Sequence, residues 1–280
     1  MTSPSMQATY ADISDADLSA NSDTGALIVN ADDWGRDVAT TDSILHCVKR
    51  ATVSSASGMV FMQDSERSAL LAREHSVDVG LHLNFTLQFS QPGCPRNLKE
   101  HQQRLSRFLR RGRFAQALFH PGLSNSFQYV VAAQIEEFQR LYGAGIRRID
   151  GHHHMHLSAN VLFGNLLPHG TIARRSFSFQ STEKSGLNRL YRKTVDYFLA
   201  RRHVLTDFFF SIAPIEPIER LRRIAELSRH AVVELETHPI KSDEFQLLTS
   251  GDQFQRIFGS PIARGYQWPA LTRAAAVQST

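Results

Sequence analysis

The feature that most constrains the fold is a repeated order of segments, in which a short apolar run leads to polar residues and then to a helical pattern. Residues 26–33 (ALIVNADD) show it first, because the run starts apolar, as a buried parallel strand does, and ends in two acids. Helical spacing follows over 40–50. Comparable strand patterns occupy 54–62, 77–86, 146–157, 171–179, 208–213 and 231–240. Strands that alternate with helices predict a parallel sheet.

The number of these units indicates how the sheet is arranged. About seven strand-then-helix units in 280 residues favour a sheet that is closed, or nearly closed, into a barrel. An open doubly wound sheet is the competing architecture. Neither GxGxxG nor GxxxxGK[ST] occurs, so the usual signatures of dinucleotide and P-loop nucleotide binding are missing.

Two regions depart from the repeat. Residues 1–24 are rich in Ser, Thr, Asp and Ala, and we expect them to form a flexible N-terminal tail before a single barrel domain at 25–280. Within that domain, the stretch at about 87–128 opens with Pro and Gly and continues as a basic helix near 98–119. Such an excursion from a barrel is expected to form a lid or wall over the substrate cleft.

Composition limits the classes of function. No run approaches the roughly 18 consecutive apolar residues of a membrane span, and the start of the chain lacks the basic and apolar parts of a secretory signal, so a cytoplasmic location is expected. The net charge of +4 is too mild to favour a nucleic-acid partner. The stretch RLSRFLRRGRF (104–114) could still bind an anionic group. Most basic groups are interpreted as solvated helix faces, including the smaller ones at Arg174–Arg175, Arg189–Lys193 and Arg220–Arg223.

Ionisable side chains gather at the ends of four predicted strands. Because catalytic groups of barrels come from the C-terminal ends of several strands, these four endings predict one shared polar site. The residues are Asp32 and Asp33, then His82, then Asp150 with His152, His153, His154 and His156, and finally Glu234, Glu236 and His238.

Read singly, these residues also allow structural roles. One of the acids at 32–33 could cap the next helix, but two consecutive carboxylates carry a desolvation cost that capping needs only once. We therefore expect one to bind a cation and the other to handle protons. His82, between two leucines, is more typical of a hydrogen-bonded core histidine. His238 is fixed by the following Pro239 and suits a structural role as well as a catalytic one.

The segment DGHHHMH (150–156) is the strongest single feature. Its four imidazoles can serve as neutral nitrogen ligands for zinc, iron or manganese. Alternation along an extended segment is expected to place His152, His154 and His156 on one side and His153 on the other. Not all of them can be ligands, so the others are expected to orient ligands or to touch substrate.

Together the segments NADDWG, GLHLNFT, DGHHHMH and ELETHP resemble the motifs of the YdjC/ChbG-like carbohydrate deacetylases, which read NADDFG, GxHxxxT, D[SG]HxHxH and ExxxHP. Order and spacing agree from about residue 26 to 265. Trp34 replaces the usual Phe, and Thr237 fills a position often held by Cys. The region 87–128 shows no match, so the resemblance says least about substrate identity.

The resemblance implies a distorted (β/α) barrel related to polysaccharide deacetylases. It also implies metal-dependent hydrolysis of an N-acetyl group from a small amino sugar or oligosaccharide, with release of acetate. Asp33, His82 and His152 would hold one divalent cation, Mg²⁺ or Zn²⁺, which leaves positions open for water and substrate. Asp32 would be the general base and His238 the general acid. Supporting or substrate-contacting roles fall to Asp150, His154, His156, Trp34 and Glu234.

Other functions stay open. A metal hydrolase for a non-sugar amide or ester would use the same ligands. A catalytically silent carbohydrate-binding or regulatory protein would not require both Asp32 and His238. Nucleic-acid binding through 104–114 would show as tight binding that falls steeply with salt. The sequence does not decide the oligomeric state, and a homodimer is one option.

Overall fold

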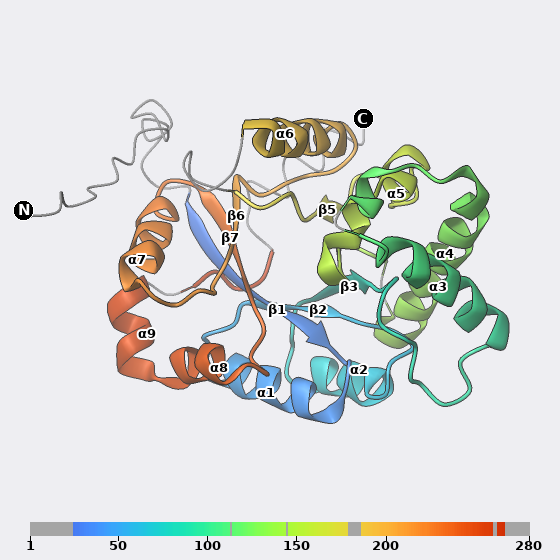
Figure 1. Ribbon diagram of the computed structural model, residues 1–280. Coiled ribbons are helices and arrows are strands. Elements are labelled where there is room, and N and C mark those ends of the chain that lie inside the picture. The colour runs from blue at the N-terminus through green and yellow to red at the C-terminus, as the bar shows by residue number, and fades with distance from the viewer. Residues whose placement is uncertain (1–24, 113, 144, 179–185, 260–261, 267–280) are drawn as a thin grey trace, which may run out of the picture.

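Seven parallel strands form the sheet in the part of the chain that the computed structural model describes, namely residues 25–112, 114–143, 145–178, 186–259 and 262–266. The strands curl into a half-barrel, with helices outside it (Figure 1), which confirms the predicted barrel class. Their bounds are β1 (Ala26–Trp34), β2 (Ser55–Gly58), β3 (Val79–Leu83), β4 (Arg148–Gly151), β5 (Ile172–Ala173), β6 (Phe208–Ser211) and β7 (Val232–Thr237).

The order of the strands is β5-β4-β3-β2-β1-β7-β6, and every pairing is parallel. The two edge strands, β5 and β6, are not paired with each other, but residues next to them form hydrogen bonds across the gap. Ile172 forms an isolated bridge with Val204, and the Ser178 amide donates to the Phe209 carbonyl at 2.8 Å. The sheet is therefore nearly closed rather than flat and open.

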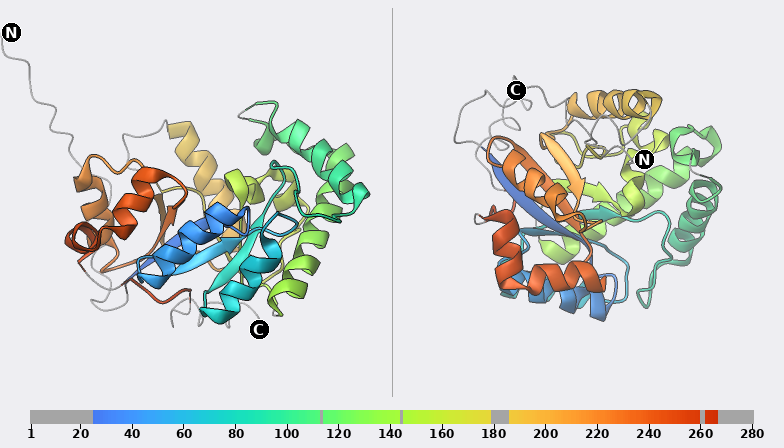
Figure 2. Two further views of the ribbon diagram at one scale, coloured as in Figure 1. Left: turned by 90° about the horizontal axis from the view of Figure 1, so that it is seen from below. Right: turned by 60° about the vertical axis from the view of Figure 1, so that its left-hand side comes forward.

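Helices cover the outside of the curled sheet, as the two views of Figure 2 show. The α-helices of the first half are α1 (Val38–Lys49), α2 (Ser65–Glu74), α3 (Arg96–Leu109) and α4 (Ser124–Tyr142). Those of the second half are α5 (Ala159–Phe163), α6 (Gly186–Ala200), α7 (Ile218–Leu227), α8 (Ser242–Thr249) and α9 (Gly251–Phe258). Short 3-10 turns lie at η1 (Ala115–Ala117), η2 (Pro121–Leu123) and η3 (His152–Leu157).

Alternation along the strands separates an apolar outside from a polar inside. In β1, Leu27, Val29 and Ala31 join a buried apolar cluster with α1, α7, α8 and α9, whereas the alternate residues Asn30 and Asp32 are buried but polar. Side chains of a strand alternate between two faces, so the second set points into the barrel. The barrel interior is thus the place where the polar strand residues meet.

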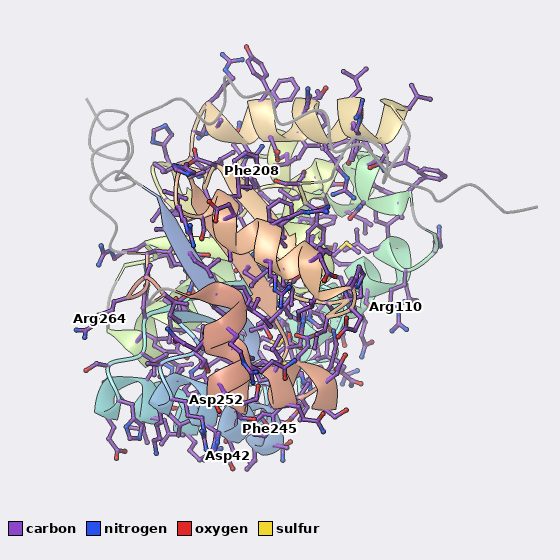
Figure 3. All side chains as sticks on the ribbon, turned by 90° about the vertical axis from the view of Figure 1, so that its left-hand side faces the viewer. Asp42, Arg110, Phe208, Phe245, Asp252 and Arg264 are labelled. Atoms are coloured by element: carbon purple, nitrogen blue, oxygen red, sulfur yellow. The ribbon has the colours of Figure 1, made fainter. Side chains whose placement is uncertain are left out.

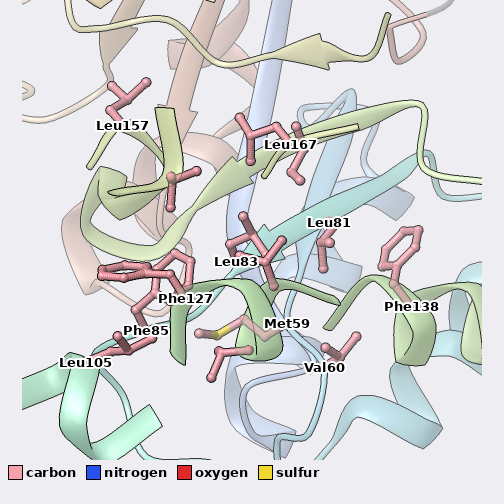
Figure 4. Close-up of a cluster of buried hydrophobic side chains, with 14 of the residues drawn as sticks. Met59, Val60, Leu81, Leu83, Phe85, Leu105, Phe127, Phe138, Leu157 and Leu167 are labelled. Atoms are coloured by element: carbon pink, nitrogen blue, oxygen red, sulfur yellow. The ribbon is translucent and has the colours of Figure 1, made fainter. Parts of the chain in front are cut away.

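The same alternation holds for β3, which lies two strands away from β1 in the sheet. Leu81 and Leu83 pack outward against α4, where Figure 4 shows Phe127 and Phe138 in the same apolar cluster. His82 lies between these two leucines in sequence and is buried, with about 1% of its surface exposed. Its position between leucines therefore follows from alternation, and its side chain belongs to the polar interior.

Some element bounds differ from the sequence predictions. The basic helix expected near 98–119 ends at Leu109 and is followed, after a turn, by η1. The helix expected near 243–258 is two helices, because the chain bends at Ser250 between α8 and α9. The segment His152–Leu157 is a 3-10 turn rather than a continuation of β4.

The excursion at 87–128 packs beside the end of β3, where Ser106 Oγ donates to the Thr86 carbonyl at 3.0 Å. Its role as a lid stays a prediction, as do the cytoplasmic location and the homodimer. The expected N-terminal tail at 1–24 lies outside the described residues. Across the described helices, none is both long enough and apolar enough to cross a membrane.

Candidate active site

The two acids at the end of β1 reach the barrel interior by different routes. Asp32 follows the alternation of the strand, whereas Asp33 has a φ of 71°, in the left-handed region that non-glycine residues rarely adopt. The pairing of β1 with β2 shifts register between Ala31 and Trp34. This irregularity turns Asp33 toward the same side as Asp32, and both are about 2% exposed.

Asp33, His82 and His152 meet at one point. Asp33 Oδ1 lies 2.9 Å from His152 Nδ1 and 3.4 Å from His82 Nε2, and one donor atom from each residue falls within 4.8 Å of the others. Burial alone would raise the pKa of Asp33, but its hydrogen bonds to the two imidazoles hold that pKa well below the usual range. Arg36 binds the second oxygen at 2.7 Å. The carboxylate is therefore ionised and fixed.

Asp150 sets the direction of His82. Its Oδ1 lies 2.7 Å from His82 Nδ1, which leaves Nε2 facing Asp33. Ser57 donates to the other oxygen of Asp150 at 2.5 Å. Burial alone would lower the pKa of His82, but the charges of Asp32 and Asp150 raise it to about 10. A carboxylate behind a histidine is a common way to orient a metal ligand.

Asp32 is held by Arg174, which is itself about 2% exposed. The guanidinium binds both oxygens of Asp32 at 2.7 Å each, and Asn30 donates to Oδ1 at 2.9 Å. Burial would raise the pKa of Asp32, but the charge of Arg174 keeps it well below its ordinary value. The same guanidinium bonds Glu234 at 2.6 Å and approaches Asp150 at 3.1 Å.

A second group of titratable residues adjoins Asp32. Donor atoms of Asp32, Glu236 and His238 lie within 4.8 Å of one another. Burial and the charge of Asp32 raise the pKa of Glu236 well above its usual range, so this residue holds a proton. Burial lowers the pKa of His238, and no partner for its Nδ1 is found among the described residues. Glu244 accepts a bond from the His238 amide at 2.5 Å.

The histidine segment turns instead of alternating. His153 and His154 have φ values of 55° and 57°, which bend the chain directly after β4, so the predicted separation of His153 from the other three is wrong. His152 faces Asp33, whereas His156 is buried with Nε2 at 2.9 Å from the Arg174 carbonyl. His154 Nε2 lies 3.7 Å from Glu236.

Two other candidate site residues, Trp34 and Glu234, are buried. Trp34 is 0% exposed within the apolar cluster behind β1, so its indole is not available to stack on a substrate. Glu234 is about 1% exposed, accepts a hydrogen bond from Arg174 at 2.6 Å and is not in the group formed by Asp33, His82 and His152.

Arg174 is the residue that the sequence interpretation missed. Grouping it with the solvated helix faces is wrong, because it follows β5 and points into the barrel, where four acidic side chains surround it. The signal that could have found it is its position directly after a strand, which is where the other site residues also stand. Arg175, by contrast, pairs with Asp196 at a partly exposed position.

The donor set fits a divalent cation. Two imidazole nitrogens and one carboxylate oxygen form one side of a coordination sphere and leave other positions for water and substrate. The buried, ionised Asp33 and the carboxylate behind His82 are features of such sites.

Fold and site together define a class: an α/β half-barrel with an Asp-and-His cluster at the carboxyl ends of its strands. A model of the family described as YdjC-like protein matches residues 26–268, and the chain belongs to this family.

Several proteins similar to this chain carry the name of a deacetylase. A carbohydrate deacetylase from Mus musculus is 31% identical over 138 residues, which cover 48% of this chain and 44% of that protein. A chitooligosaccharide deacetylase from Proteus mirabilis is 31% identical over 136 residues, 48% of this chain and 51% of that protein. The chain thus spans about half the length of these two relatives. A carbohydrate deacetylase from Brevibacillus brevis is 27% identical over 234 residues, 82% of this chain and 87% of that protein.

A solved structure supports the fold. It is a protein from Enterococcus faecalis described as a proposed cellobiose-phosphate cleavage protein, with a TM-score of 0.53 and 20% sequence identity over 90% of this chain and 94% of that one.

Proposed function

We propose that this protein is a metal-dependent carbohydrate deacetylase, which hydrolyses the N-acetyl group of a small amino sugar or oligosaccharide. The observation that carries the proposal is the convergence of Asp33, His82 and His152 within 4.8 Å, with the carboxylate of Asp32 beside them. The names of the relatives support the choice of an acetylated sugar.

Asp33, His82 and His152 would hold the cation. When bound there, it supplies a Lewis acid that polarises the acetamide carbonyl and makes water more acidic. Two imidazole donors favour Zn²⁺, and Mg²⁺ is the alternative. His82 serves through Nε2, because Asp150 occupies Nδ1.

Asp32 acts as the general base in this proposal. Arg174 and Asn30 fix its carboxylate, and Oδ2 lies 3.9 Å from His82 Nε2, next to the three donors. It accepts a proton from the attacking water while the new C–O bond forms. Arg174 keeps Asp32 ionised, so the base is ready at neutral pH.

His238 acts as the general acid. Because burial lowers its pKa, the ring is neutral before the reaction and must first receive a proton. Asp32 lies in the same 4.8 Å group and can pass on the proton taken from water. His238 then protonates the departing nitrogen as the C–N bond breaks, which yields acetate and a free amino sugar.

Two substitutions separate the roles of the adjacent acids. We expect Asp33→Ala to abolish metal binding, measured by titration calorimetry, and with it turnover. Asp32→Asn should bind metal with unchanged stoichiometry and release acetate from N-acetylated glucosamine oligosaccharides at least about 100-fold more slowly. Normal acetate release by Asp32→Asn would overturn the assignment of the base.

The choice of substrate class needs its own test, because a non-sugar amidase would use the same ligands. Acetate release is measured from N-acetylglucosamine and its short oligosaccharides and from simple N-acetyl amides, with and without a chelator. Chelator-sensitive release from the sugars alone supports the proposal. Equal release from simple amides would favour a general metal hydrolase.

A further inference from the structure

A large apolar surface lies away from the candidate active site. Among the described residues, eight of the thirteen exposed large apolar side chains fall in three segments, 117–123, 157–169 and 186–203. They are Leu118, Phe119, Phe163, Leu187, Leu190, Tyr191, Tyr197 and Phe198. We call these three segments the α5–α6 face. Figure 1 shows α6 and α5 at the top of the molecule.

Contacts between rings show that this surface is continuous across the three segments. The ring centroids of Phe119 and Phe163 are 6.3 Å apart, and those of Phe163 and Phe198 are 6.4 Å apart. The ring of Tyr197 lies 5.8 Å from that of Phe198. On α6 itself, Val195 and Leu199 are buried while Leu187 is 82% exposed. Figure 3 shows side chains projecting outward from α6 into open space. Exposed apolar surface of this extent marks an interaction site.

An apolar cavity opens within the same face. It has a volume of about 580 Å³, which lies in the usual range for ligand pockets, and α5, α6 and the residues after them line it. Leu162, Leu167 and Val195 contribute to its walls, and Arg201 and Arg202 stand among its lining residues. The Arg202 Nε is buried and has no hydrogen-bond partner within the described residues. Apolar walls can bind a hydrocarbon chain, and a guanidinium with an unpaired N–H can bind an anionic group. The cavity therefore suits an amphiphile with an anionic headgroup.

The charge of the face is one-sided. Its segments contain five Lys or Arg residues, and Asp196 is the one acidic residue in their sequence. The carboxylate of Asp196 is turned inward, where it binds Arg175 and accepts from the Ser176 amide at 2.8 Å. The outer side of α6 therefore offers apolar groups together with cationic groups such as Lys193.

We propose that the α5–α6 face docks on an anionic lipid bilayer and that its cavity receives a hydrocarbon chain of a membrane lipid, with Arg201 and Arg202 next to the headgroup. Aromatic and leucine side chains beside Lys and Arg on one helix are the features of an interfacial helix. The cationic groups bind anionic headgroups while the apolar ones enter the acyl boundary.

The cationic groups and the apolar surface argue for a bilayer over two other occupants. A second copy of this chain, docked by the same patch on both molecules, would place the two sets of cationic groups against each other. Nucleic acid would use the cations and the rings, but it would leave the leucines and the apolar cavity without a role.

The test is co-sedimentation of the full chain with vesicles, without any substrate, so its outcome is independent of the proposed deacetylation. We expect binding to vesicles of phosphatidylglycerol and phosphatidylcholine, and much weaker binding to phosphatidylcholine alone. The double variant Leu187→Ser/Leu190→Ser should bind at least about tenfold more weakly, because two exposed leucines no longer enter the bilayer. Thr194→Trp, which puts an indole at the cavity, should also weaken binding.

The matched control is Leu70→Ser on α2, a leucine that is 59% exposed outside the α5–α6 face. It should bind vesicles as the wild type does, and circular dichroism should be the same for all variants. Absence of binding to the anionic vesicles, or equal losses in the control and the double variant, would refute the proposal. So would light scattering that shows a dimer dissociated by the double variant, or tight oligonucleotide binding without vesicle binding.

Discussion

Arg174 illustrates how a single buried cation can organise a site. Its guanidinium lies among Asp32, Asp150 and Glu234 with almost no exposed surface. Charges buried in this way are stable only while they are paired, and removal of one partner leaves the others uncompensated. The carboxylates around Arg174 therefore depend on it both for their ionisation and for their positions.

We expect Arg174→Met to lower the free energy of unfolding by about 3–5 kcal/mol, measured by urea denaturation, and to abolish turnover. Arg174→Lys should lose less stability, because it keeps the charge but not the paired bonds to Asp32. Arg175→Met is the control at the neighbouring position, where the pair with Asp196 is partly exposed. Its cost should be about 1 kcal/mol or less. Equal losses in the two methionine variants would show that the buried network contributes little.

At the scale of elements, the turn η3 connects the sheet to the candidate metal site. Gly151 precedes it in extended conformation, and a Cβ built there would lie 2.9 Å from the His156 amide nitrogen and 3.1 Å from the His156 Cβ. Because backbone cannot move away as a flexible side chain does, a side chain at 151 would displace the turn that carries His152.

We therefore expect Gly151→Ala to weaken metal binding by about tenfold, in the range typical of changes just behind metal ligands. Titration calorimetry with Zn²⁺ measures the change. Gly112→Ala is the control, since a Cβ at Gly112 meets no atom within 4 Å. Unchanged affinity in Gly151→Ala would mean that the turn can shift without moving His152.

The elements also show what the sequence could predict. Alternation and apolar runs are local patterns, so the sequence predicts the strands and, with them, the acids and histidines at their ends. The sequence does not predict the turn at His152–Leu157, because this turn depends on contacts with a distant segment. One of them is the hydrogen bond between His156 and the Arg174 carbonyl. Arg174 was missed because the predicted strand runs over 171–179 and places this residue inside it, whereas β5 ends at Ala173, directly before Arg174. The roles of Asp32 and His238 in catalysis stay predictions.

For the whole molecule, the barrel interior is polar and the stability depends on which interior groups hold protons. The pKa of Glu236 is raised by burial and by Asp32, so this residue favours folding at low pH. Burial lowers the pKa of His203 and of His156 to about 4, so these residues favour folding at higher pH. The contribution of Glu236 to the pH dependence of stability thus opposes those of the two histidines. Comparing wild type with a single variant isolates the contribution of one residue.

His203 offers that comparison, because it lies beside β5 with its Nδ1 3.1 Å from Thr171 Oγ1 and is not part of the candidate active site. In the unfolded chain the pKa of His203 is near 6.5. Between about pH 6.5 and pH 4, the imidazole is therefore protonated in the unfolded chain but neutral in the folded protein. The contribution of His203 to stability therefore falls as the pH falls through this window. On going from pH 7 to pH 5, wild type should lose about 1–2 kcal/mol more unfolding free energy than His203→Gln, measured by urea denaturation. Between pH 7 and pH 8 the difference between the two proteins should change by only about 0.2 kcal/mol, because the imidazole is mostly neutral in both states. A difference that does not change between pH 7 and pH 5 would mean that His203 becomes protonated as easily in the folded protein as in the unfolded chain.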